Sequence, residues 1–266
     1  MTASSKNDWM ADDHALLIEA VRAGGELAAS YFGQDLENWM KRPGQPVSEA
    51  DLAVDALLRD TLMSARPDYG WLSEESAEST GREEAERLWV VDPIDGTRAF
   101  LEGRPEYTVS VGLLENGRPV LGAVFNPQTG EFFEAVKGGG ARCKGRTLHV
   151  GEAGNIENAR ILVSRGEFKN LASHDRLINC EISSISSIAY KIVLVAADRA
   201  DATVSLLPKS DWDLAGADII LAEAGGMLTT ADGKPMVYNQ TRPRHSSVLA
   251  AGRGLSAELS AELADD

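Results

Sequence analysis

The chain has 266 residues, of which 43% are hydrophobic, 25% charged and 6% aromatic. This composition is typical of a globular protein with a substantial core, and it excludes a disordered, collagen-like or coiled-coil chain. The formal net charge of −15 argues against binding to nucleic acid or to an anionic membrane. There is no apolar run long enough to span a membrane, and Met1 to Asp13 lacks the apolar region of a signal peptide. We therefore expect a cytoplasmic protein.

The first half of the chain is predicted to begin with two helices. Apolar residues recur at helical spacing over 12–32, and Ser48 with Asp51 three residues later is typical of a helix start. The stretch 41–46, rich in Pro, Gly and basic residues, predicts a loop between these helices. Apolar runs then predict strands at 70–72 and 88–91 and a three-stranded meander at 107–114, 120–125 and 131–136.

The second half mixes strands and helices. Strands are predicted at 161–163, 203–207 and 246–251, and helices at 187–197, 213–223 and 255–263. This mixed order favours a layered α/β (α+β) architecture. We predict an N-terminal α+β subdomain, residues 1–155, and a C-terminal α/β subdomain, residues 156–266.

Acidic side chains follow two of the predicted strands. Glu74 comes after the run 70–72, and Asp92 and Asp95 come after the run 88–91. Carboxylates at the end of an apolar strand are costly to bury unless a cation compensates their charge. Carboxylate and carbonyl oxygens are the ligands of Mg²⁺ rather than of Zn²⁺, and N–H groups at Gly96-Thr97 would suit phosphate oxygens. Together these features predict metal-assisted transfer of a phosphoryl group to water.

Three sequence blocks carry a family resemblance. They are Trp71-Leu72-Ser73-Glu74-Glu75-Ser76, Trp89-Val90-Val91-Asp92-Pro93-Ile94-Asp95-Gly96-Thr97, and Trp212-Asp213-Leu214-Ala215-Gly216-Ala217 followed by Glu223-Ala224-Gly225-Gly226. Their order and spacing over about 12–252 resemble the inositol monophosphatase superfamily of magnesium-dependent, lithium-sensitive phosphomonoesterases. The resemblance implies an αβαβα five-layer sandwich.

The resemblance also implies roles for individual residues. Two or three Mg²⁺ ions would activate a water and neutralise charge on the phosphoryl group. Thr97 would orient the attacking water, with Asp51 behind it as hydrogen-bond acceptor, so Asp51, Thr97 and Glu74 would carry the catalysis. The N–H groups of Gly96 and Thr97 would cradle the phosphate, beside Asp95 and Asp213. The implied metal ligands are Glu74, Asp92, the carbonyl of Ile94, Asp95 and Asp213.

The metal ligands do not select among the inositol phosphatases, bisphosphate nucleotidases, fructose-1,6-bisphosphatases and histidinol phosphatases of this superfamily. Inositol phosphatases carry a glutamate just before the position of Asp213, whereas 202–210 contains no acidic residue. It contains Lys209, and Lys191 stands upstream in a Ser-x-x-x-Lys pattern that resembles the 3′(2′),5′-bisphosphate nucleotidases. We therefore expect a nucleotidase whose lysines pair with a second phosphate. An inositol-1-monophosphatase is the alternative function. The alternative interpretation of Lys191 is a solvated residue on a helix.

Two further possibilities concern activity and assembly. An inactive binding or regulatory homologue is expected to lack at least one ligand, and the chain retains them all. A homodimer is left open, with Tyr31, Trp39 and Trp71 as candidate surface residues.

Overall fold

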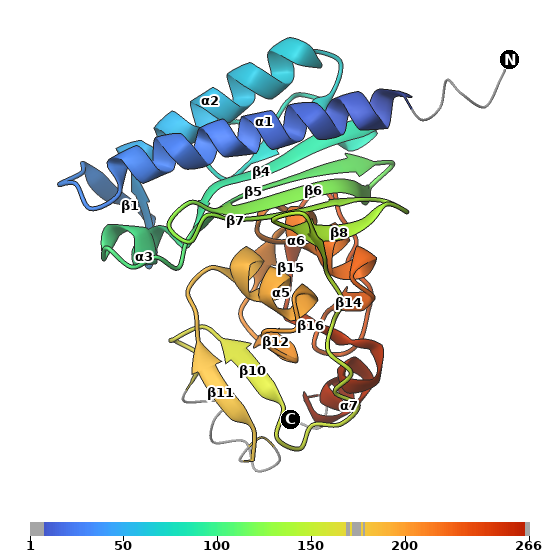
Figure 1. The fold of residues 1–266 in the computed structure, drawn as a ribbon. Helices are drawn as coiled ribbons and strands as arrows, with labels where there is room; N and C mark the ends of the chain where they lie inside the picture. The colour runs from blue at the N-terminus through green and yellow to red at the C-terminus, as the bar shows by residue number, and fades with distance from the viewer. Residues whose placement is uncertain (1–7, 169–170, 172–176, 178, 264–266) are drawn as a thin grey trace, which may run out of the picture.

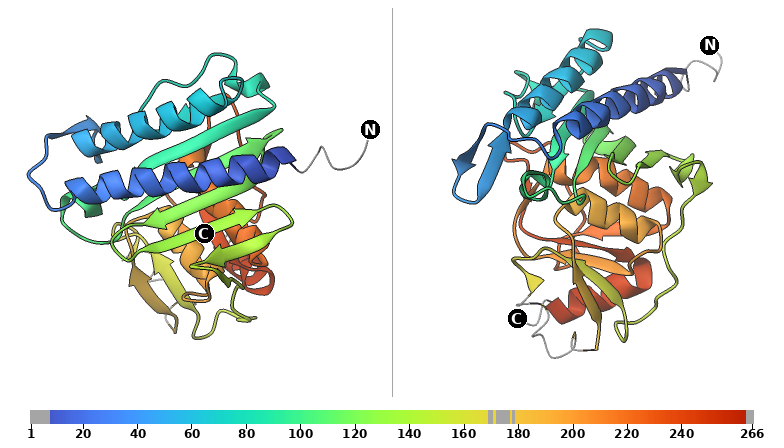
Figure 2. Two further views of the ribbon diagram at one scale, coloured as in Figure 1. Left: turned by 45° about the horizontal axis from the view of Figure 1, so that its top comes forward. Right: turned by 60° about the vertical axis from the view of Figure 1, so that its left-hand side comes forward.

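The computed structural model describes residues 8–168, 171, 177 and 179–263. Its helices and sheets form five layers in the order αβαβα, which confirms the predicted sandwich (Figure 1). Two turned views show the same stacking, with the helices α1 and α2 outermost on one side (Figure 2). None of the described helices has the length and hydropathy needed to span a bilayer.

The outer helices are α1 (Asp8–Tyr31) and α2 (Glu49–Ala65), which pack on a seven-stranded sheet. The predicted start of α2 is confirmed, because Ser48 and Asp51 form a capping box. In this sheet β3 and β4 are parallel neighbours and all other pairs are antiparallel. Its strands, in spatial order, are β3 (Gly70–Ser73), β4 (Arg87–Asp95), β5 (Thr108–Glu115), β6 (Arg118–Asn126), β7 (Glu131–Val136), β8 (Gly140–Cys143) and β9 (Arg146–Thr147). The short helices η2 (Arg82–Glu84) and α3 (Thr97–Leu101) precede and follow β4.

A second sheet of five strands carries the other half of the sandwich. Its order is β11 (Glu181–Ser184), β10 (Arg160–Val163), β12 (Ala202–Ser205), β16 (Val248–Gly252) and β14 (Gly226–Thr229). The middle helices are α5 (Ile188–Ala196) and α6 (Asp211–Glu223), and α7 (Arg253–Leu263) packs on β14 and β16. A separate ladder joins β13 (Lys209–Ser210) to β15 (Arg244–His245).

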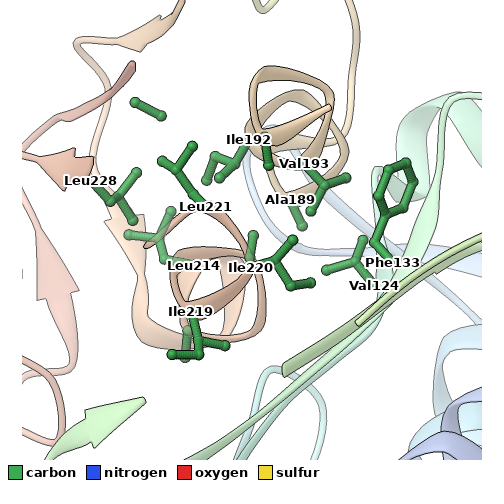
Figure 3. Packing of buried hydrophobic residues seen from close by; sticks show 14 of the residues in the cluster. Val124, Phe133, Ala189, Ile192, Val193, Leu214, Ile219, Ile220, Leu221 and Leu228 are labelled. Atoms are coloured by element: carbon green, nitrogen blue, oxygen red, sulfur yellow. The ribbon is translucent and has the colours of Figure 1, made fainter. Parts of the chain in front are cut away.

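The middle layer packs tightly against the seven-stranded sheet. Val193 of α5 and Ile220 of α6 lie next to Val124 of β6 and Phe133 of β7 in one buried cluster (Figure 3). Glycines let α6 approach the sheet closely: a Cβ at Gly122 would lie 2.2 Å from the carbonyl oxygen of Gly216. This contact fixes α6, and with it the first-turn residue Asp213, against the strands that carry the other acidic residues.

Two sequence-based expectations about the first half are wrong. The stretch 41–46 is not a loop but part of a hairpin of β1 (Asn38–Arg42) and β2 (Gln45–Ser48). All five residues of β1 are exposed, so its sequence lacks the apolar alternation that marks a half-buried strand. Trp71 is not a surface residue, because its side chain is fully buried and its Nε1 donates to Ser76 Oγ at 2.8 Å.

The division at residue 155 stays a prediction. The strands from Gly70 to Thr147 form the seven-stranded sheet, and those from Arg160 onward lie outside it. However, α6 packs against β5 and β6 as well as against β14, so the second half contributes to both sides of the middle layer.

Candidate active site

Three predicted metal ligands meet at one edge of the seven-stranded sheet. Glu74 directly follows β3, Asp92 lies in the neighbouring strand β4, and Asp213 stands in the first turn of α6. One carboxylate oxygen from each residue lies within 4.8 Å of the other two. This spacing suits shared coordination of a cation.

The protonation behaviour of this cluster fits a divalent cation. Asp92 is only 1% exposed, and burial followed by the charge of Glu74 raises its pKa well above the usual range. Burial, and then the charge of Glu74, likewise raises the pKa of Asp213 to about 8. Buried carboxylates in contact are unfavourable when ionised together, and a bound cation reverses that penalty. The oxygen donor set is the one Mg²⁺ prefers.

Lys41 supplies the positive charge nearest to Glu74. Its Nζ donates to Glu74 Oε1 at 2.8 Å and to Glu75 Oε1 at 2.7 Å. Burial nevertheless raises the pKa of Glu75 to about 7. The hairpin of β1 and β2 therefore brings an ammonium group onto one of the predicted metal ligands.

A bulge between Asp92 and Asp95 interrupts the pairing of β4 with β5. Residues three apart in a regular strand point to opposite faces, and a bulge re-aims them. Asp95 Oδ2 accepts hydrogen bonds from Ser187 Oγ at 2.5 Å and from Ala189 N at 2.6 Å, at the start of α5. Burial raises the pKa of Asp95 to about 6. Asp95 thus links the acidic cluster to α5.

Thr97 and Asp51 form a second chain of contacts beside the cluster. Thr97 Oγ1 lies 2.9 Å from Asp51 Oδ1 and 3.1 Å from the carbonyl oxygen of Ile94, both acceptors for its single proton. Asp51 Oδ2 is held in turn by the N–H and the hydroxyl of Ser48. Gly96 has φ +97°, and a Cβ there would lie 2.8 Å from the carbonyl oxygen of Glu106, so this turn requires glycine. Thr97 can therefore direct its proton inward and accept a hydrogen bond from water.

The two lysines predicted to bind substrate are not among the residues that line the cleft at Glu74 and Asp213. Lys191 is fully buried in α5, so its interpretation as a solvated helix residue is wrong. Among the described residues its Nζ has no hydrogen-bond partner. Burial, and then the charge of Lys209, lowers the pKa of Lys191 to about 8, while the charge of Asp95 opposes that shift. Lys209 is half-buried in β13, and its Nζ donates to the carbonyl oxygen of Leu207 at 3.4 Å.

A cleft of about 890 Å³ opens from Glu74 and Asp213 toward solvent. Its lining includes the hairpin residues Lys41 and Arg42 and the segment 241–244, which contains Arg242 and Arg244. Sequence reasoning missed these two arginines. The local signal was the run Arg242-Pro243-Arg244-His245 in a strongly acidic chain, but nothing in the run shows which site it faces.

Comparisons with known proteins identify the family of this chain. A model of the inositol monophosphatase family matches residues 9–265. The inositol-1-monophosphatase of Rhizobium meliloti (strain 1021) is 36% identical over 233 residues, which cover 83% of this chain and 87% of that protein. The 3′(2′),5′-bisphosphate nucleotidase CysQ of Aggregatibacter actinomycetemcomitans is 30% identical over 243 residues, or 84% and 86% of the two chains.

A solved structure has a similar fold. The extragenic suppressor protein suhB from Bartonella henselae superposes with a TM-score of 0.83 and 27% identity, covering 94% of this chain and 97% of that one. The family match extends over nearly the whole described chain and includes all three sequence blocks of the site. The chain therefore belongs to the inositol monophosphatase family.

Proposed function

We propose that this phosphatase is a magnesium-dependent 3′(2′),5′-bisphosphate nucleotidase, which hydrolyses adenosine 3′,5′-bisphosphate to AMP and phosphate. Membership of the family makes the chain a hydrolase of phosphoric monoesters. The narrower proposal rests on one observation: carboxylates at the base of the cleft share it with basic side chains from two separate segments. We infer that the cleft accommodates one anionic group at the carboxylates, through metal ions, and a second at the basic side chains.

At the acidic end, we assign Glu74, Asp92, Asp95, Asp213 and the carbonyl of Ile94 to two or three Mg²⁺ ions. Bound Mg²⁺ would supply an activated water and neutralise charge on the phosphoryl oxygens. Thr97 would hold that water in line with phosphorus, because its own proton is directed to Asp51 or to the Ile94 carbonyl. The first turn of α3, beginning at Gly96 and Thr97, would present N–H groups to the phosphate.

The surroundings of segment 202–210 argue against recognition of ring hydroxyls. Glu167 is buried and accepts hydrogen bonds from residues 205–207 of this segment. Its oxygens accept hydrogen bonds from the N–H groups of Leu206 and Leu207 and from Ser205 Oγ. A carboxylate engaged in this way is unavailable to a sugar or inositol hydroxyl.

Two sets of cations could hold the second phosphate. Lys191 and Lys209 offset the charge of Asp95 and Asp213, respectively, and the Nζ of Lys191 lacks a hydrogen-bond partner within the described chain. Arg242 and Arg244 line the open part of the cleft. Both sets favour a substrate with more than one anionic group.

The alternative substrate is inositol 1-phosphate. It is favoured by the name of the Rhizobium meliloti relative, an inositol-1-monophosphatase that is 36% identical to this chain. Under this alternative, an acceptor for the ring hydroxyls would have to come from outside 202–210.

Phosphate release from two substrates in parallel tests the proposal. We expect release with Mg²⁺ from adenosine 3′,5′-bisphosphate at a much higher kcat/KM than from inositol 1-phosphate, and inhibition by added Li⁺. A preference for inositol 1-phosphate would contradict the nucleotidase assignment. No release from either substrate, with Mg²⁺ bound, would contradict it as well and would favour another phosphorylated metabolite or an inactive binding homologue.

A further inference from the structure

We propose that Arg242 and Arg244 bind the phosphate of the substrate that is not cleaved, with Arg42 lining the same cleft. This inference deepens the proposed function and rests on it for the identity of the substrate. It assigns the specificity of the enzyme to a segment, 241–244, that lies outside the three sequence blocks of the metal site.

The first argument is the lack of counterions at these arginines. Arg42, Arg242 and Arg244 are exposed, and no carboxylate of the described chain forms an ion pair with them. Some arginines of this acidic protein are paired, as Arg160 is with Asp198 and Asp201, whereas others such as Arg59 have no ion pair in the described chain. The distinguishing feature of Arg42, Arg242 and Arg244 is that they line one cleft. Three unpaired guanidinium groups in one cleft create a local positive field within a chain of net charge −15.

The second argument is that the segment is held rigidly. Asp211 is fully buried, and its carboxylate forms hydrogen bonds at both ends of the segment 239–245. Asp211 Oδ2 accepts a hydrogen bond from Asn239 N at 2.7 Å, and Oδ1 lies 2.8 Å from His245 Nε2. In addition, Arg82 Nη1 donates to Asn239 Oδ1 at 2.7 Å. A preorganised loop binds an anion without the cost of ordering a flexible one.

The third argument is the connection of this segment to the metal site. Arg244 pairs with Ser210 in the ladder of β15 and β13, and Ser210 caps the helix whose first turn carries Asp213. The Asp211 N–H also donates to the carbonyl oxygen of Pro243 at 3.0 Å. The backbone therefore fixes how far the arginine segment lies from a predicted metal ligand, as selection of a substrate by its length requires.

The arginines are better placed than the two lysines for this role. Lys191 is sealed within the core, and Lys209 directs its Nζ to the carbonyl of Leu207. Guanidinium groups can also form two parallel hydrogen bonds to a phosphate, which an ammonium group cannot.

The test compares wild type with the double variant Arg242→Gln/Arg244→Gln. The matched control is Arg59→Gln, which removes a charge from an exposed arginine of α2 with no ion pair in the described chain. For each protein, kcat/KM is measured with adenosine 3′,5′-bisphosphate and with adenosine 3′-monophosphate. Calorimetry with AMP and with adenosine, neither of which is cleaved, gives binding independent of turnover.

We expect the double variant to lower the ratio of bisphosphate to monophosphate kcat/KM by about tenfold or more, mainly through KM, and to weaken AMP binding similarly. Arg59→Gln should leave both quantities unchanged. An unchanged ratio, or a parallel loss with both substrates, would overturn the inference. If wild type hydrolyses no bisphosphate, the proposed function fails, and AMP binding no tighter than adenosine would then overturn the arginine subsite separately.

Discussion

The cleft has two parts that differ in how their residues are held. The base comprises the carboxylates of Glu74, Asp92, Asp95 and Asp213, and the wall comprises the guanidinium groups of Arg242 and Arg244. At the base, Asp92 is buried within β4 and Asp95 is hydrogen-bonded to α5, so the carboxylates are fixed by the core of the sandwich. On the wall, Arg242 and Arg244 are exposed and unpaired, and only the backbone of their segment is fixed. Substitutions in the base would alter core packing and the repulsion between carboxylates, whereas substitutions of the wall arginines would leave the core intact.

This difference suggests separate locations for phosphoryl transfer and for the choice of substrate. In our proposal, the base supplies the residues for phosphoryl transfer, and the wall supplies charges that select a particular substrate. A family with one metal site and several substrates is expected to vary the wall and keep the base.

The largest expected effect is at the base. Asp92→Asn should lower kcat/KM by about 10⁴-fold or more, because a neutral amide is a poor ligand for Mg²⁺. The rate of phosphate release measures this loss. Metal-free Asp92→Asn should also unfold at a higher temperature than metal-free wild type, because the substitution removes a buried charge and its repulsion with Glu74.

Thermal unfolding with EDTA and with Mg²⁺ provides the matching control. Mg²⁺ should stabilise wild type and Asp60→Asn, an exposed acidic residue of α2, but not Asp92→Asn. An equal Mg²⁺ effect in all three proteins would contradict the assignment of Asp92 to the metal site.

The next effect concerns the water-orienting pair. Thr97→Val should lower kcat by about 10²–10⁴-fold, because it removes the hydroxyl bonded to Asp51. Thr97→Ser keeps the hydroxyl and should recover most of the rate, as measured by phosphate release at saturating substrate. A Thr97→Val enzyme with nearly normal kcat would remove Thr97 from the mechanism.

A smaller effect is expected where the wall meets the base. Asp211→Asn should weaken the hydrogen bonds to Asn239 and His245, which lowers the free energy of unfolding by about 1–3 kcal/mol. It should also lower the preference for bisphosphate severalfold, since the backbone that carries the two arginines loses its fixed position. Glu223→Gln is the matched control, because Glu223 accepts hydrogen bonds from Gly138 and Gly140 away from the cleft.

Denaturant unfolding and the substrate ratio separate the two roles. Both variants should be destabilised, but only Asp211→Asn should change the ratio of kcat/KM values. A changed ratio in Glu223→Gln would mean that loss of stability alone alters selectivity.

The smallest effect concerns Lys191 and pH. The pKa of Lys191 is about 8 in the fold against 10.5 for an ordinary lysine, so the unfolded chain binds more protons between these values. The contribution of Lys191 should therefore make the free energy of unfolding increase as the pH rises from about 8 to 10.5. Lys191→Met should remove that gain and stabilise the protein at pH 7 by about 2–3 kcal/mol. Denaturant unfolding at pH 7 and pH 10 measures both differences, and a destabilised Lys191→Met at pH 7 would contradict this account.

The base could be predicted from sequence because its residues lie in short contiguous motifs at the ends of buried strands. Glu74 and Asp92 follow apolar runs of β3 and β4, and parallel pairing of these strands brings them together. The bulge that re-aims Asp95 has no comparable signal, since Pro93 alone does not specify it.

The wall could not be predicted because its position depends on distant contacts. Asp211 holds Asn239 and His245, which are 28 and 34 residues away in the chain. The hairpin that carries Lys41 and Arg42 is exposed throughout β1 and therefore has no burial pattern. Burial of Lys191, by contrast, has a sequence signal, because the other eight residues of α5 are apolar and a helix without a polar face is buried on all sides.

A crystal structure with Ca²⁺ and adenosine 3′,5′-bisphosphate would test the central claim most directly. Ca²⁺ takes the same oxygen ligands as Mg²⁺ with looser geometry. We expect metal ions on Glu74, Asp92 and Asp213 beside the 3′-phosphate, and the 5′-phosphate against Arg242 and Arg244. A nucleotide whose 5′-phosphate lies away from the segment 241–244, with metal ions bound at the base, would contradict the account.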